Sequence, residues 1–193
     1  MYNFQRKAAM EGVRYRDQCA DRLARYGFTI IQFGLRVNDC GVDVDIVAAN
    51  MQGVQFLIEC KGGTGEGKKQ PGFESSDNIR KAIASAFCLS RSDSHSGQPF
   101  TPLFVMTDYI VPTRSANYTQ LSVVPTALML DVVSSQDYRR LKYWGKADYY
   151  VVLAHQKDNP CVTDSVEGNG FWAGHTPRIE ANGELTINGA TGD

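Results

Sequence analysis

Four charged side chains are concentrated in residues 41–63, GVDVDIVAANMQGVQFLIECKGG. Asp43 and Asp45 open one apolar run, and Glu59 and Lys61 close the next. Carboxylates that lie close together repel one another unless a cation lies between them. A divalent ion with oxygen ligands is the natural candidate for that cation. If the fold brings these residues together, we expect chemistry based on a hard metal ion.

The same stretch predicts a β-hairpin. Residues 42–49 and 55–60 are typical of two strands, and the turn between them, residues 50–53, contains Asn and Gly. Both residues accept the backbone angles that a chain reversal requires. Side chains alternate between the two faces of a strand, so pairing about this turn places Asp45 almost opposite Glu59.

The rest of the chain predicts helices alternating with strands. Helices are expected at residues 4–26, 77–90, 114–122 and 134–143. Further strands are expected at residues 28–33, 102–106, 126–131 and 149–154. This order predicts an α/β sandwich with a mixed sheet.

Apolar stripes predict the buried faces of the first two helices. In the first helix the stripe contains Val13, Ala20, Leu23 and Ala24. In the second helix it contains Ile79, Ile83, Ala86 and Phe87.

The length and composition fit one globular domain. The chain has 193 residues, of which 42% are hydrophobic and 21% charged. No internal linker divides it. After residue 156 the chain is rich in Gly, Asn, Asp and Thr, so residues 157–193 are expected to form a C-terminal extension with at most a small hairpin around Asn182 and Gly183.

Several classes of protein are disfavoured. No apolar run reaches the ~20 residues that a membrane helix needs, and the first residues do not resemble a signal peptide, so we expect no membrane partner and a cytoplasmic location. The five cysteines are odd in number and lack a Cys-x-x-Cys pair, which argues against a disulfide framework or a zinc ribbon.

Charge is distributed unevenly along the chain. Residues 1–146 contain 18 Lys and Arg against 14 Asp and Glu, whereas residues 147–193 contain 2 against 7. A basic main body is compatible with a polyanionic partner, although solvated surfaces often have this balance.

The spacing of Asp45 and Glu59-Cys60-Lys61 resembles the PD-(D/E)xK nuclease superfamily, which has the restriction-endonuclease-like fold. The signature lies within VDIVA…FLIECKG, on a hairpin preceded by one helix and followed by another. The resemblance covers roughly residues 12–131, and Val44 replaces the Pro of the family pattern. It implies a restriction-endonuclease-like α/β/α sandwich with a central mixed β-sheet, formed by residues 1–156.

The resemblance also implies a function. Members of the superfamily are metal-dependent nucleases, so we expect hydrolysis of phosphodiester bonds in DNA with Mg²⁺, or with Mn²⁺ as substitute, by an endonuclease of restriction, repair or mobile-element type. A homodimer is a further expectation of the resemblance. The alternatives are a Holliday-junction resolvase, with the same chemistry, and a non-catalytic nucleic-acid-binding protein on the same fold.

The resemblance assigns the chemistry to three residues. Asp45 and Glu59 would hold the metal ion, helped by the backbone carbonyl of Cys60 and by water. Lys61 would orient or activate the attacking water and screen the charge that builds on the phosphate. The Cys60 thiol points to the opposite face of the strand and is expected in the core.

Two further carboxylates are weaker candidates for the metal site. Asp43 lies two residues before Asp45 on the same face, and the sequence leaves open which of them binds the ion; Asp45 is favoured because the apolar residues after it match the family. Many relatives add an acidic residue from the first helix, for which Asp17 is the first candidate and Glu11 or Asp21 the next.

Basic residues elsewhere are candidates for contacts with the DNA backbone. Lys68 and Lys69 lie in the loop GGTGEGKKQPG, whose spacing is similar to that of a phosphate-binding loop. Lys69 replaces the Ser or Thr of that motif and Pro71 blocks the helix that should follow, so no nucleotide cofactor is expected.

The helices after the hairpin add weaker candidates. In the helix that follows the hairpin, Asn78 and Lys81 are candidates to face the substrate. Arg139 and Arg140 precede Tyr143 and Trp144, a cluster that would grip phosphate and stack on a base or, alternatively, bury its aromatic side in the core.

Overall fold

The computed structural model describes most of the first 146 residues and a short hairpin near the C-terminus. The described ranges are 2–62, 72–92, 103–109, 111–112, 114–124, 130–134, 138–146, 176–179 and 185–188.

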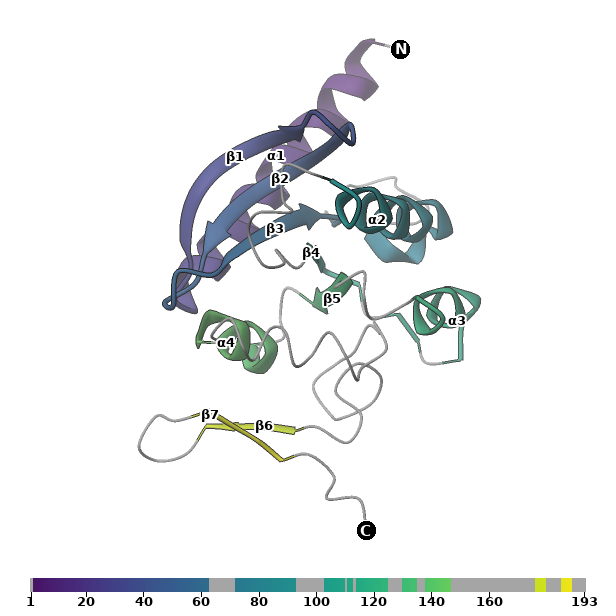
Figure 1. The fold of residues 1–193 in the computed structure, drawn as a ribbon. Helices are drawn as coiled ribbons and strands as arrows, with labels where there is room; N and C mark the ends of the chain where they lie inside the picture. Colours follow the sequence, from purple (N-terminus) through teal and green to yellow (C-terminus); the bar gives the residue numbers. More distant parts are fainter. Residues whose placement is uncertain are drawn as a thin grey trace.

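Helices and strands alternate through these ranges (Figure 1). In chain order they are α1 (Tyr2–Arg25), β1 (Thr29–Val37), β2 (Val42–Ala49), β3 (Gln55–Cys60), the 3₁₀ turn η1 (Gly72–Glu74), α2 (Ser76–Leu89), β4 (Leu103–Thr107), α3 (Ala116–Ser122), β5 (Leu130–Ser134), α4 (Tyr138–Lys146), β6 (Thr176–Ile179) and β7 (Leu185–Asn188).

Five strands form one mixed sheet in the order β1-β2-β3-β4-β5. The first three strands are an antiparallel meander, and β4 and β5 continue the sheet parallel to β3. Parallel neighbours need a crossover, and α2 lies in the connection between β3 and β4. β6 and β7 pair separately, which confirms the small hairpin expected near the C-terminus.

One face of the sheet is covered by α1 and α4, and we call it the α1 face. Strand side chains such as Ile46, Ile58 and Val133 pack there against Leu23 of α1 and Trp144 of α4. In Figure 1, α1 runs behind β1–β3 and its N-terminal end projects beyond the sheet.

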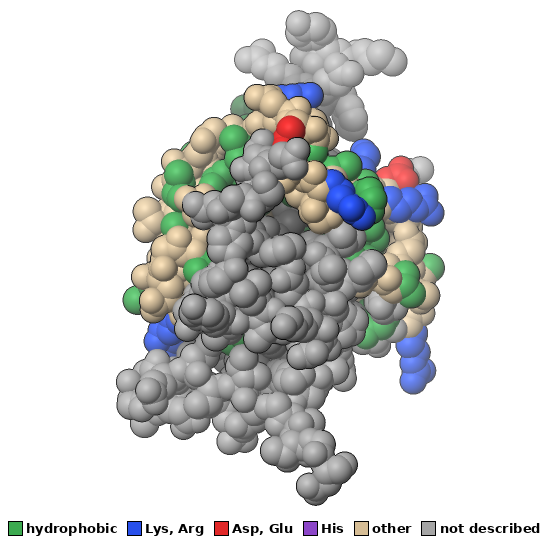
Figure 2. All heavy atoms as spheres, in the orientation of Figure 1, with side chains coloured by type: hydrophobic (Ala, Val, Ile, Leu, Met, Phe, Trp, Pro, Cys, Tyr) green, Lys and Arg blue, Asp and Glu red, His purple; other side chains and the backbone are tan. Residues whose placement is uncertain are grey.

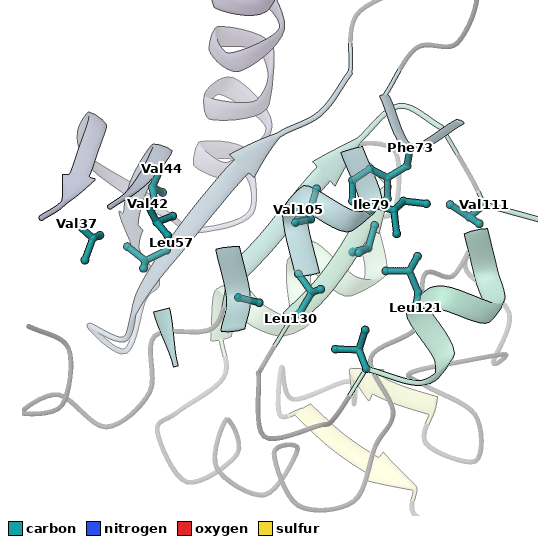
Figure 3. Close-up of a cluster of buried hydrophobic side chains, with 14 of the residues drawn as sticks. Val37, Val42, Val44, Leu57, Phe73, Ile79, Val105, Val111, Leu121 and Leu130 are labelled. Carbon is teal, nitrogen blue, oxygen red and sulfur yellow. The ribbon is translucent and has the colours of Figure 1, made fainter. Parts of the chain in front are cut away.

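The opposite face, the α2 face, is covered by α2 and α3. Val105 and Leu130 of the strands pack there with Ile79 of α2 and Leu121 of α3 (Figure 3). Since both faces are covered by helices, the chain is a three-layered α/β sandwich.

The β2–β3 turn is held by one buried side chain. The Asn50 Oδ1 accepts hydrogen bonds from the amides of Gln52 and Val54, and its Nδ2 donates to the carbonyl oxygen of Trp144. Gly53 has φ +78°, a conformation that favours glycine. The turn therefore fixes the register of β2 against β3, on which the site depends.

Several sequence expectations need correction. Of the strand expected at 126–131 and the helix expected at 134–143, the described parts are Leu130–Ser134 and Tyr138–Lys146, which extend beyond the expected ends; residues 125–129 and 135–137 lie outside the described residues. Of the expected helix stripes, Val13 and Phe87 are 48% and 52% exposed, and Ala24 is exposed as well. The strand expected at 149–154 lies outside the described residues.

Within the described residues, no helix is both long enough and apolar enough to cross a bilayer.

Candidate metal centre

The Asp45 carboxylate is anchored to the end of β3. Its Oδ2 accepts a 2.8 Å hydrogen bond from the amide N–H of Cys60. The β2–β3 pairing ends at Ile46 opposite Ile58. Beyond it the hydrogen bond to Cys60 places Asp45 beside the end of β3, which carries Glu59 and is followed by Lys61.

A local twist accompanies this contact. Val44 packs on the α2 face, whereas Ile46, two residues later, packs on the α1 face, so the alternation of β2 breaks at Asp45. Gly34 of β1, opposite Asp45 in the register, has φ +66°. At this break the Asp45 carboxylate accepts from the Cys60 amide.

Glu59 and Lys61 form a partly buried ion pair beside Asp45. The Lys61 Nζ lies 3.3 Å from the Glu59 Oε2, and the two side chains are 27% and 5% exposed respectively. Besides this contact with the Lys61 ammonium, no described residue donates a hydrogen bond to the buried Glu59 Oε2.

The donor set suits a hard cation. Asp45 and Glu59 supply two carboxylates, and Mg²⁺ is commonly bound by one or two carboxylates while it keeps several waters. Among the described residues, no group of three His, Cys, Asp or Glu side chains converges. The remaining ligands would be water and, as the sequence suggested, the Cys60 carbonyl.

The site lies at the carboxyl ends of the parallel strands β3 and β4. The Lys61 amide donates to the carbonyl oxygen of Met106 at 2.8 Å. This bond continues the hydrogen bonding between β3 and β4 one residue beyond the end of β3. Thr107 and Asp108 end β4 beside Lys61, and sequence reasoning gave them no role. The signal that could have found them is the rule that α/β sheets bind ligands at the carboxyl ends of their strands.

Two glycines make close contacts on either side of Lys61. A Cβ added to Gly62 would overlap the Tyr15 ring of α1, and a Cβ added to Gly72 would overlap the Lys61 carbonyl oxygen. Gly72 also has φ +54°, which favours glycine. The backbone around Lys61 is therefore packed from both α1 and η1.

Asp43 lies apart from this group. Its side chain is 71% exposed, and both of its oxygens accept 3.1 Å hydrogen bonds from Arg36 of the neighbouring strand β1. Of the two aspartates between which the sequence left the choice open, Asp45 is the one that the structure places beside Glu59.

Asp17 is directed away from the sheet. Its side chain is 57% exposed and pairs with Arg16 at 3.0 Å. The buried positions of α1 near the site are Tyr15 and Cys19, and residue 17 lies on the opposite side of the helix from both. Glu11, one turn before Tyr15, shares its face.

The Cys60 thiol lies on the α1 face, in the core, as expected. A hydrogen bond with the Cys19 thiol and burial raise the pKa of the Cys60 thiol well above its usual range. The thiol is therefore protonated at neutral pH, and the strand presents only the backbone of Cys60 to the site.

The expected DNA contacts are only partly described. Lys68, Lys69 and the side chains of Arg139 and Arg140 lie outside the described residues, and Lys81 is exposed on α2. In Figure 2, several of the described Lys and Arg side chains lie near one another at the upper right of the view, and others lie singly elsewhere.

The aromatic residues of α4 belong to the core. Tyr143 and Trp144 have no exposed surface, and the Trp144 Nε1 donates to the Asp131 carboxylate at 2.8 Å. Of the two readings of this cluster, the structure therefore supports the amphipathic helix with a buried aromatic side, and neither ring is available to stack on a base.

Comparison with protein-family models, curated proteins and solved structures gives no match to this chain.

Proposed function

We propose that this protein is a metal-dependent nuclease of the PD-(D/E)xK type that hydrolyses phosphodiester bonds in DNA, as an endonuclease. The observation that carries the proposal is a hydrogen bond to the Asp45 carboxylate. Its donor is the amide of Cys60, the residue between Glu59 and Lys61. A binding module has no need of two carboxylates near the place where a phosphate would bind, whereas a metal-dependent hydrolase does.

The order of helices and strands also supports the proposed nuclease function. The carboxylates lie on a three-stranded antiparallel meander that follows one helix and precedes another, and the next strand joins β3 in parallel. This is the element order on which the resemblance to the restriction-endonuclease-like fold rests.

The residues have separate tasks in this proposal. Asp45 and Glu59 would hold Mg²⁺, which supplies charge stabilisation at the phosphate and lowers the pKa of a bound water. Lys61 is 27% exposed, so its ammonium can reach a phosphate at the surface while the Glu59 carboxylate keeps it beside the site. There it orients the attacking water and stabilises the developing negative charge.

A plasmid-cleavage assay with titrated Mg²⁺ or Mn²⁺ tests the proposal. We expect metal-dependent cleavage by the wild type and a loss of roughly 10²–10³-fold in kcat for Lys61→Ala, the cost of removing one charge-stabilising donor. Arg80→Ala, which removes an exposed basic side chain of α2 that has no expected contact with substrate, is the matched control. Full cleavage by Lys61→Ala would remove the site assignment.

The same assay separates the alternatives. A resolvase would cut a four-way junction and leave linear duplex intact, whereas a general endonuclease would cut both. Binding of DNA without cleavage of linear, junction or single-stranded substrates at any metal concentration would favour the non-catalytic binding protein.

A further inference from the structure

Asn78 is bound to the backbone beside Lys61. It lies in the first turn of α2, is half-buried, and its Nδ2 donates a 2.7 Å hydrogen bond to the carbonyl oxygen of Gly72. The sequence suggested Asn78 for contact with substrate. In the structure its amide is instead engaged with η1.

Gly72, which accepts the hydrogen bond from Asn78, also packs against Lys61. The Gly72 Cα packs so closely on the Lys61 carbonyl oxygen that a Cβ would overlap it. The same Cβ position lies 3.0 Å from the Thr107 Oγ1 and 3.2 Å from the Asp108 Oδ1, so Gly72 also contacts the end of β4. Gly72 therefore packs against the Lys61 peptide and the end of β4, and a shift of Gly72 towards them would displace one or the other.

The other side of Lys61 is fixed by the sheet. Its amide donates to the Met106 carbonyl oxygen at 2.8 Å, and the preceding amide, that of Cys60, donates to Asp45. Lysine has a flexible four-carbon side chain, so the placement of its ammonium depends on how firmly its backbone is held. Reactive groups must be held to within about 0.5 Å for full activity.

We propose that Asn78 is a positioning residue for Lys61, acting through Gly72. This inference rests on the proposed nuclease function. Asn78 ties the first turn of α2 to the point where the chain returns from residues 63–71, and so holds Gly72 against the Lys61 carbonyl.

Two substitutions of Asn78 separate an effect on the position of Lys61 from an effect on the stability of α2. Asn78→Ala removes the donor. Asn78→Asp also removes it, but an aspartate in the first turn favours the helix electrostatically. Both variants should lower kcat roughly 10–100-fold, as expected for loss of a residue that supports a reactive group, with KM unchanged within about twofold.

Asn117 offers a matched control. Its Nδ2 donates to the carbonyl oxygens of Phe73 and Glu74 in the same 3₁₀ turn, and its Oδ1 accepts from the Ser76 hydroxyl. Asn117→Ala thus removes more hydrogen bonds from this junction than Asn78→Ala does, without touching Gly72. It should retain the wild-type kcat.

Amide hydrogen exchange at Lys61 supplies a readout that does not need catalysis. Both Asn78 variants should exchange the Lys61 amide faster than the wild type, and Asn117→Ala should not. Wild-type kcat and Lys61 exchange in Asn78→Asp, or an equal loss of kcat in Asn117→Ala, would overturn the proposal. If the wild type does not cleave DNA, the exchange rates alone decide whether Asn78 holds Lys61.

Discussion

The amide of Cys60 donates a 2.8 Å hydrogen bond to the carboxylate of Asp45 across the β2–β3 pair. This bond fixes an aspartate from one strand beside the glutamate and lysine of the next. It also distinguishes Asp45 from Asp43, whose carboxylate is engaged by Arg36 at the exposed edge of the sheet.

The two aspartates should therefore differ in their effect on cleavage. We expect Asp45→Asn to lower kcat by about 10²-fold or more, because a metal ligand loses its charge. Asp43→Asn removes only an exposed ion pair, so kcat should stay within twofold and the free energy of unfolding within about 0.5 kcal/mol. Plasmid cleavage and urea denaturation check both results. The reverse ranking would move the metal site to Asp43.

Gly62→Ala should destabilise the protein, because the added methyl group overlaps the Tyr15 ring. Overpacking of this kind costs about 1–3 kcal/mol in the free energy of unfolding. Gly12→Ala is the matched control, since nothing lies within 4 Å of its Cβ position in α1, and it should stabilise the protein by about 0.5–1 kcal/mol. Urea denaturation measures both. An unchanged stability of Gly62→Ala would contradict the packing of α1 on the end of β3.

Trp144→Phe should also lower stability. The indole N–H donates to the Asp131 carboxylate, which is 2% exposed, and a hydrogen bond to a charged group contributes about 1.5–3 kcal/mol. Asp131→Asn keeps an acceptor oxygen and should lose less. Equal midpoints of urea denaturation for Trp144→Phe and the wild type would show that this bond does not stabilise the fold.

Stability should depend on the Cys60 thiol at alkaline pH. The Cys19 thiol and burial raise the Cys60 pKa, so the folded protein holds this proton more tightly than the unfolded chain. The resulting stabilisation is complete below the unfolded pKa of about 8.5 and is lost as pH rises from there through the higher folded pKa. Thermal unfolding between pH 7 and 10 should show a steeper fall for the wild type than for Cys60→Ala. Parallel curves would contradict the assignment.

Local sequence patterns were sufficient for the hairpin. Residues 42–49 and 55–60 carry strand-like runs around a turn whose Asn and Gly are specific for reversal, and the structure has strands with the same bounds. The register that sets Ile46 opposite Ile58 follows from the turn, because register is set locally. The catalytic and metal-binding roles of Asp45, Glu59 and Lys61 stay predictions.

Long-range contacts explain what the sequence could not show. Asp131 interrupts an apolar run, so the local pattern predicts that a strand ends there. Trp144, thirteen residues later, provides the donor that permits its burial in β5. The position of Thr107 beside Lys61 depends on which strands become parallel neighbours, which local periodicity does not encode. The rotation of α1 that buries Tyr15 likewise follows from packing on the sheet.

Calorimetric titration with Mn²⁺ tests the central claim most directly, since it measures cation binding at Asp45 and Glu59 without DNA. We expect one binding event in the wild type, weakened at least about tenfold in Asp45→Asn and in Glu59→Gln and unchanged in Asp43→Asn. Absence of binding heat in the wild type, or equal affinity in all four proteins, would contradict it.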